Sequence, residues 1–210
     1  MRITIPTYFT LFRLLLIPLM VVVYFSLAPR AAHFYTALIF LIASVTDWID
    51  GFLARKLNAV SNFGKFLDPV ADKLIVCVAL VLIVYEYTYY RNSSFDYLFK
   101  QNDILVTIAA IIVLCREIIV SSLREWMASL GKSSKVAVSY LGKIKTTAQM
   151  TAICFLLWRP NRYSDIYEGM YWIEHMSIGL VWLAVVLTIW SMIDYLIIGF
   201  KSVSELEEKK

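Results

Sequence analysis

The sequence predicts an all-α integral membrane protein, with six transmembrane helices forming one domain over residues 1–210. Hydrophobic residues make up 60% of the 210 residues and the mean hydropathy is +0.69, whereas a soluble domain carries about 45–50% apolar residues. With their flanks, most of the apolar cores approach the roughly 20 residues that a spanning helix needs. There are six cores: Leu11 to Leu27, Ala32 to Thr46, Leu74 to Tyr85, Ile104 to Leu114, Thr146 to Trp158 and Ile178 to Ile198.

The stretches beside these cores predict where the helices begin and end. Residues 1–9 are mixed in character, with a helix-start signal at Pro6-Thr7, and predict an interfacial segment that leads into the first helix. The second helix is expected at about 31–56, followed by a polar turn at Asn58 to Asn62. Pro69 lies early in the third helix, where it is tolerated in the first turn and produces a kink deeper in.

Loop composition and charge predict the orientation in the membrane. Outer loops are expected at Tyr87 to Gln101 and Pro160 to Glu168, and a C-terminal tail at 201–210 that is frayed and solvated from Glu205 to Lys210. Only five of the 20 basic residues lie in outer loops when the N-terminus is placed inside, as the positive-inside rule requires. This orientation puts residues 47–72, the 124–145 region and the tail on the cytoplasmic side. The net charge of +4 then reflects topology and contact with anionic membrane lipids rather than nucleic-acid binding.

Four aspartates lie in or beside segments that are otherwise apolar enough to span a bilayer. They belong to the run Asp47-x2-Asp50-Gly51-x2-Ala54-Arg55-x8-Gly64-x3-Asp68-x3-Asp72. A carboxylate at membrane depth is costly unless it is paired or binds a cation, so such acids indicate function. On a helix, Asp47, Asp50 and Ala54 share one face, and Asp68 and Asp72 share a face of the next helix. The sequence therefore predicts a helical hairpin with facing acids.

The acids have the composition of a site for hard divalent cations. Mg2+ and Mn2+ take oxygen ligands, and two such ions a few ångström apart share several carboxylates. His33 and His175, the only histidines, fall toward the outer side, so a zinc or copper centre at the acids is not expected.

The other fixed positions of the run suit a diphosphate. Gly51 and Gly64 let the backbone approach a bulky ligand closely, and Arg55 offers a two-pronged donor for phosphate. The structural alternative is a set of helix-end acids that pair with Arg55, Lys65 and Lys73.

All eight fixed positions of this run match the signature of the CDP-alcohol phosphotransferase family. The chain therefore resembles that family. The resemblance extends along nearly the whole chain and is strongest to bacterial members that make phosphatidylglycerophosphate. Their pattern is carried by Ile5-Pro6-Thr7, Thr10, Arg13, Arg116-Glu117, Leu123-Arg124-Glu125-Trp126-Met127, Val136-Ala137-Val138-Ser139 and Gly142-Lys143-x-Lys145-Thr146-Thr147-x-Gln149.

This resemblance implies a homodimeric enzyme of the bacterial cytoplasmic membrane whose active site faces the cytoplasm. It would transfer the phosphatidyl group of CDP-diacylglycerol to the 1-hydroxyl of sn-glycerol 3-phosphate and release CMP, using two Mg2+ or Mn2+ ions. The implied catalytic residues are Asp72 and Asp68, and only the resemblance makes Asp72 the base. The implied metal ligands are Asp47, Asp50, Asp68 and Asp72, and the implied contacts to cytidine diphosphate are Gly51, Ala54, Arg55 and Gly64.

A second, basic set is predicted on the same face as the acids, around the fourth and fifth helices. Glycerol 3-phosphate is a dianion that must be desolvated beside another polyanion, so its site needs positive charge. Arg116 lies deepest in an apolar run, although Glu117 could hold it in a structural ion pair. The candidates for binding the acceptor phosphate are Arg116, Arg124, Lys135 and Lys143.

Three alternatives remain open from the sequence. A transferase of the same family could use another acceptor alcohol, because the run from Asp47 to Asp72 concerns only the CDP end. A cation transporter could use the acids as its ion path, although transporter sites lie near the bilayer midplane and these acids lie near one surface. A membrane scaffold without activity would require the motif to be a relic.

Overall fold

A computed structural model describes residues 5–57, 62–91, 97–131, 140–158 and 171–207. All six predicted helices are present, and the described residues contain no strand. The helices are α1 (Ile5–Ser26), α2 (Pro29–Leu57), α3 (Asn62–Arg91), α4 (Tyr97–Ser129), α5 (Tyr140–Trp158) and α6 (Tyr171–Glu207).

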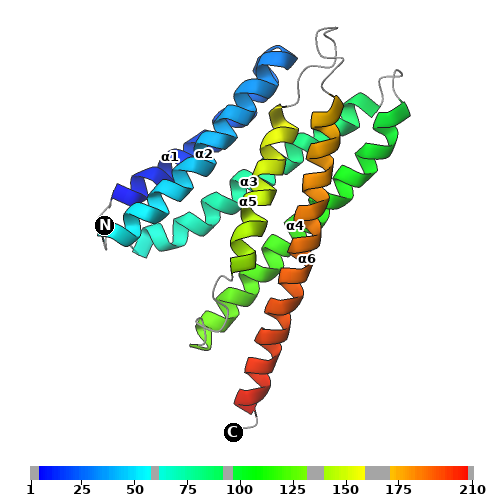
Figure 1. The fold of residues 1–210 in the computed structure, drawn as a ribbon. Helices are drawn as coiled ribbons and strands as arrows, with labels where there is room; N and C mark the ends of the chain where they lie inside the picture. Colours follow the sequence, from blue (N-terminus) through cyan, green and yellow to red (C-terminus); the bar gives the residue numbers. More distant parts are fainter. Residues whose placement is uncertain (1–4, 58–61, 92–96, 132–139, 159–170, 208–210) are drawn as a thin grey trace.

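The helices form two groups that α3 and α5 connect (Figure 1). In the first group α1 packs against α2 and α3, and in the second α6 packs against α4 and α5. α3 contacts α4, and α5 contacts α2 and, less extensively, α3. Across the described residues α4 and α5 make no contact with each other, which leaves room between them for the cavity that follows.

The outer surface of the bundle is apolar. Four helical stretches are long and apolar enough to cross a membrane: Thr7–Ser26, Pro29–Ile49, Ile104–Ser129 and His175–Lys201. α5 adds a shorter apolar stretch, Thr146–Trp158. Many large apolar side chains on these helices, such as Leu15 and Trp190, are exposed, and exposed apolar surface of this extent marks an interaction surface, here with lipid. The chain is therefore a multi-pass membrane protein.

Small residues allow the helices to approach closely in the core. Ala43, Ala71, Ala79 and Ala109 are fully buried, and without a bulky side chain at such positions two helix backbones can pack tightly. Phe40, also fully buried, fills the space between them.

Several helix ends differ from the sequence prediction. The predicted outer loop at Tyr87 to Gln101 was wrong at both ends, because residues 87–91 extend α3 and residues 97–101 begin α4. Tyr87 is only 1% exposed, so packing overrides the polar character of this stretch. The predicted tail is helical over most of its length, since α6 continues to Glu207. The other predicted outer loop, Pro160 to Glu168, lies outside the described residues.

The N-terminal segment and Pro69 are also placed. α1 begins at Ile5, so residues 5–9 of the expected interfacial segment are its first turns. Pro69 lies inside α3, beyond its first turn, where a proline removes one backbone hydrogen bond.

Just after the C-terminal end of α4, Gly131 has a φ of 70°, a conformation that glycine adopts without strain. Its amide donates a hydrogen bond to the carbonyl of Ala128.

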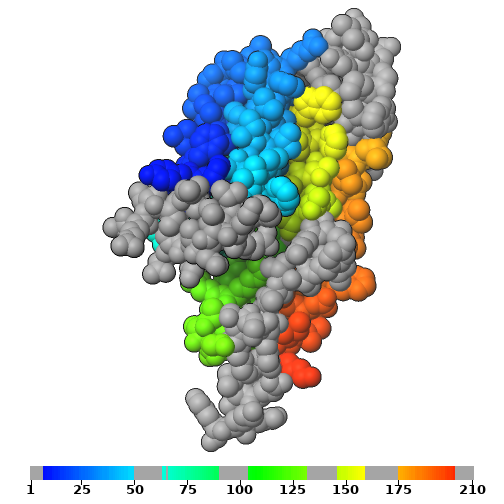
Figure 2. All heavy atoms as spheres, turned by 60° about the vertical axis from the view of Figure 1, so that its left-hand side comes forward, coloured from blue at the N-terminus to red at the C-terminus, as the bar shows by residue number. Residues whose placement is uncertain are grey.

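α4 and α6 are much longer than the membrane is thick. α6 has 37 residues, which at 1.5 Å per residue correspond to about 55 Å, against roughly 30 Å for the hydrocarbon core. In Figure 2 the ends of α4 and α6 extend beyond α1 and α2. This end of the molecule carries the candidate site.

A buried polar cluster joins α1, α2 and α3 at the opposite end. Tyr24 donates a hydrogen bond to the carboxylate of Glu86, and His33 Nε2 lies 2.9 Å from the other oxygen of that carboxylate. The rings of Tyr24 and His33 stack with centroids 6.1 Å apart. One carboxylate on α3 thus joins the C-terminal end of α1 to the N-terminal end of α2.

Replacing Glu86 by leucine should destabilise the bundle without disturbing the cavity. Tyr24 and His33 would lose a buried partner, at a cost of about 1–3 kcal/mol, and the thermal unfolding midpoint in detergent should fall. Glu86→Gln, which keeps an acceptor for Tyr24, is the matched control and should fall less. Equal midpoints for the leucine variant and the unsubstituted protein would contradict a stabilising role for this cluster.

Candidate active site

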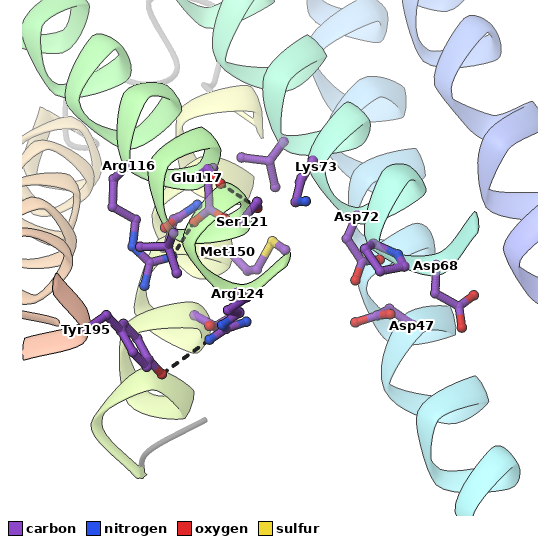
Figure 3. Close-up of a pocket in the computed structure, with 15 residues that line it drawn as sticks. Asp47, Asp68, Asp72, Lys73, Arg116, Glu117, Ser121, Arg124, Met150 and Tyr195 are labelled. Carbon is purple, nitrogen blue, oxygen red and sulfur yellow. Dashed lines mark hydrogen bonds and ion pairs between the residues drawn. The ribbon is translucent and has the colours of Figure 1, made fainter. Parts of the chain in front are cut away.

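A cavity of about 340 Å3 lies between five of the six helices. Its lining comes from α2, α3, α4, α5 and α6 and combines charged and apolar groups. The lining residues are Asp47, Asp68, Pro69, Asp72, Lys73, Val76, Arg116, Glu117, Val120, Ser121, Arg124, Thr146, Gln149, Met150 and Tyr195. Figure 3 shows the three aspartates on one side of the cavity and the two arginines on the other. We call these sides the acid wall (Asp47, Asp68 and Asp72) and the arginine wall (Arg116 and Arg124).

The acid wall is built by the predicted hairpin of α2 and α3. Asp47 comes from α2, and Asp68 and Asp72 come from successive turns of α3. Their side chains are partly exposed toward the cavity, 45% for Asp47 and 40% for Asp72. The three carboxylates therefore offer oxygen atoms to a ligand while their helices remain packed.

Arg13 of α1 supports the acid wall from behind. Its side chain is 1% exposed, and its Nη1 atom lies 2.9 Å from Asp47 Oδ1 and also pairs with Asp72. One turn earlier on α1, Thr10 donates a hydrogen bond to Asp68. α1 does not line the cavity, yet it contacts all three acids. Within the described ion pairs, Asp47 and Asp72 are neutralised by Arg13. The structural alternative expected Lys73 as a partner of the acids, and no described ion pair joins them.

The acid wall offers the type of ligand atom, carboxylate oxygen, that a hard divalent cation binds. Carboxylate oxygens from two helices meet at one cavity, and such cations bind oxygen. Among the described residues, however, no group of three His, Cys, Asp or Glu side chains is close enough together to hold a metal ion. The guanidinium of Arg13 supplies the positive charge between Asp47 and Asp72 in this structure, and the side chain of Asp50 lies outside the described residues.

The arginine wall is held by α4 and α6. Arg116 is 7% exposed; its Nη1 lies 2.9 Å from Glu117 Oε1, and its Nη2 donates to Ser191 Oγ at 3.0 Å. Arg124 donates to the hydroxyl of Tyr195 at 3.2 Å and lies over the tyrosine ring, 5.1 Å from its centroid. Ser191 and Tyr195 are one turn apart on α6, so this helix orients both arginines. The ion pair expected between Arg116 and Glu117 is present, and the guanidinium still faces the cavity.

The structure describes some of the predicted site residues and not others. Gly64 is buried in α3. Gly51, Ala54 and Arg55 belong to α2, as does Asp50, but their side chains lie outside the described part. Lys143 belongs to α5 with its side chain likewise not described, and Lys135 lies outside the described residues.

Sequence reasoning left several residues that line or support the cavity without a role in the site. Arg13 and Gln149 belong to the pattern that carries the family resemblance. Arg13 gave a further signal, because a charge that interrupts an apolar run is costly unless it has a partner. Lys73 was expected only as a partner of the acids. Ser191 and Tyr195 gave no signal, because each is a common residue on an otherwise ordinary helix and only the packing of α6 brings it to the site.

Comparison with known proteins supplies a family context. Residues 3–190 match the family model described as CDP-alcohol phosphatidyltransferase. Curated proteins from Escherichia coli strain K12 and Shigella flexneri serotype 5b are each 49% identical to the chain over 196 residues, covering 93% of this chain and 94% of theirs. A protein from Salmonella choleraesuis is 50% identical over 199 residues, with the same coverage. All three are named CDP-diacylglycerol–glycerol-3-phosphate 3-phosphatidyltransferase.

The contacts of Arg13 predict an asymmetry in stability. Arg13 is buried, whereas Asp47 and Asp72 are partly exposed, so replacing both acids takes two carboxylate partners from a buried charge, whereas replacing Arg13 leaves acids that water can reach. Asp47→Asn combined with Asp72→Asn should lose about 3 kcal/mol or more, and Arg13→Met clearly less. Thermal unfolding in detergent with a chelator present measures both. A larger loss for Arg13→Met would refute this account.

Proposed function

The chain belongs to the CDP-alcohol phosphatidyltransferase family, and on this premise we propose that it transfers the phosphatidyl group of CDP-diacylglycerol to sn-glycerol 3-phosphate. The products are phosphatidylglycerophosphate and CMP. Three curated relatives that share half of its residues over nearly their full length are named for this reaction. The observation that carries the proposal is one cavity in which an acid wall faces an arginine wall.

The two walls suit the two substrates. The acceptor carries a phosphate dianion, which the arginine wall attracts and can bind through several N–H donors. The donor carries a diphosphate, which the acid wall would repel without a cation between them. We therefore assign the glycerol 3-phosphate to Arg116 and Arg124, together with Lys135 and Lys143, and the diphosphate to the opposite side of the cavity.

The proposed site binds two divalent cations, Mg2+ or Mn2+. Their proposed ligands are Asp47, Asp50, Asp68 and Asp72. When bound, such a cation neutralises the diphosphate and polarises the bond that breaks. In its absence Arg13 pairs with Asp47 and Asp72, so it holds these acids in place for a cation to bind.

The reaction is a single displacement at phosphorus. Asp72, with Asp68 beside it, takes the proton of the acceptor 1-hydroxyl as a general base. The acceptor oxygen forms a bond to the phosphorus that carries the diacylglycerol, the bond from this phosphorus to the bridging oxygen breaks, and its electron pair leaves with CMP. The walls hold the hydroxyl and the diphosphate in one cavity, which removes most of the entropic cost of their encounter.

The remaining assignments extend the proposal beyond the described side chains. The cytidine diphosphate would contact Gly51, Ala54, Arg55 and Gly64, which lie at the cytoplasmic ends of α2 and α3. The six helices would act as one catalytic domain, as a homodimer among membrane lipids, with the cavity open to the cytoplasm. The excess of basic residues in the predicted inner segments supports this orientation.

The alternatives are less well supported. A cation transporter or an inactive scaffold does not account for an arginine wall opposite the acids, and family membership favours a transferase. A different acceptor alcohol stays within the family, and the curated relatives described above argue against it because they are named for glycerol 3-phosphate as the acceptor.

The function is tested by CMP release from CDP-diacylglycerol with purified protein in detergent. Release should require both Mg2+ or Mn2+ and glycerol 3-phosphate, should stop on chelation, and should yield phosphatidylglycerophosphate as the lipid product. Asp72→Asn is the matched inactive control, since it keeps the shape of the acid and removes the base. Release with another alcohol but not with glycerol 3-phosphate would overturn the assignment of the acceptor.

Arg124→Ala tests the arginine wall. Losing a charge-assisted contact to the acceptor phosphate should raise the KM for glycerol 3-phosphate roughly 10- to 100-fold, while the KM for CDP-diacylglycerol should change little. Lys201→Ala on α6 removes one positive charge outside the cavity and is the control for nonspecific electrostatics. An unchanged KM for glycerol 3-phosphate in the Arg124 variant would refute its role.

A further inference from the structure

Gln149 of α5 presents a buried acceptor without a partner to the cavity. The residue is 6% exposed, and its Oε1 atom is inaccessible to solvent and has no hydrogen-bond partner among the described residues. Such a group is destabilising unless something donates to it. In a site that binds ligands, the missing donor is expected to come from the ligand.

Within the described part of the chain, no donor lies within hydrogen-bond distance of Gln149 Oε1. Gln149 lines the polar cavity and also a small crevice behind it, which is otherwise lined by apolar side chains such as Leu80, Val113 and Ile153. It therefore lies at the floor of the cavity, where the polar lining gives way to the core. Met150, the next residue on α5 and also in the lining, offers no strong donor.

The chemistry of an amide oxygen restricts what it can bind. It accepts hydrogen bonds and cannot donate them, so it is unsuited to the oxygens of an ionised phosphate or diphosphate. It requires an O–H or N–H group. In the proposed reaction, the acceptor brings two hydroxyls, and the one that reacts must give its proton to the acid wall. The 2-hydroxyl of glycerol 3-phosphate therefore remains as the donor for Gln149 Oε1.

The position of α5 agrees with this assignment. α5 packs against α2 and α3, which carry the acid wall, and against α6, which holds the arginine wall. An acceptor molecule with its phosphate at the arginines and its 1-hydroxyl at the acids spans the cavity, so its central carbon passes α5. The Nε atom of Arg116, which is buried and likewise lacks a partner in the described part of the chain, is a donor for the phosphate end.

We propose that Gln149 determines acceptor specificity by accepting a hydrogen bond from the 2-hydroxyl of glycerol 3-phosphate. The assignment rests on the proposed function and refines its acceptor site. Gln149 would recognise the 2-hydroxyl of the acceptor, whereas the arginines recognise the charge of its phosphate.

The test compares two acceptors in two enzymes. Glycerol 3-phosphate and 3-hydroxypropyl phosphate differ only in the 2-hydroxyl, so the ratio of their kcat/KM values isolates what that hydroxyl contributes. The unsubstituted enzyme should prefer glycerol 3-phosphate by about 10- to 100-fold, because loss of the hydroxyl leaves a buried acceptor unpaired. Gln149→Met, which keeps the length of the side chain without its oxygen, should reduce the preference to within about threefold, mainly through the KM for glycerol 3-phosphate.

Two further variants keep the result interpretable. Phe155→Leu changes an exposed apolar side chain of the same helix that does not line the cavity and should keep the full preference. Gln149→Asn keeps the amide but withdraws it by one methylene, so it should lose the preference even if the methionine variant does not fold. A preference that persists in either folded Gln149 variant would overturn the role of Gln149 alone. Absence of CMP release by the unsubstituted enzyme with both acceptors would overturn the proposed function, and this assignment with it.

Discussion

The structure depends on one buried positive charge placed behind a cluster of acids. Arg13 is almost fully buried and pairs with Asp47 on α2 and Asp72 on α3, so three helices meet at a single guanidinium. Acids at the edge of a low-dielectric bundle repel one another and lower its stability unless a counter-charge is present. By supplying it within the chain, α1 lets the acid wall exist before any cation binds, and this explains why a helix that never lines the cavity is part of the site.

The same separation of tasks recurs on the opposite wall. Arg116 and Arg124 face the cavity from α4, while Ser191 and Tyr195 on α6 fix their orientation. Each wall thus has one layer that meets ligands and one layer that holds it in place. This arrangement restricts the motion of long side chains, whose ordering otherwise costs entropy when a ligand binds.

Sequence reasoning succeeded where a residue's role depends on its own helix. The hydropathy pattern predicted six helices, and the spacing of Asp68 and Asp72 put both on one face of α3. It failed where tertiary packing decides. Tyr87 looks like a loop residue by composition but is buried in α3, and nothing near Ser191 or Tyr195 in the sequence shows that α6 will bring them to the cavity. The proposed roles of all site residues stay predictions, and the side chains of Asp50, Arg55, Lys135 and Lys143 also lie outside the described residues.

The two polar clusters of the first three helices bear on the order in which the protein is made. Glu86 joins α1, α2 and α3 at one end, and Arg13 joins them at the other. The contacts described for both clusters lie within the first three helices. Chains emerge from the ribosome N-terminus first and fold in parts as they appear. A unit of α1, α2 and α3, with polar contacts at both ends, can therefore assemble in the membrane while α4 is still being synthesised. The helices that carry and support the arginine wall would then pack against this preformed unit.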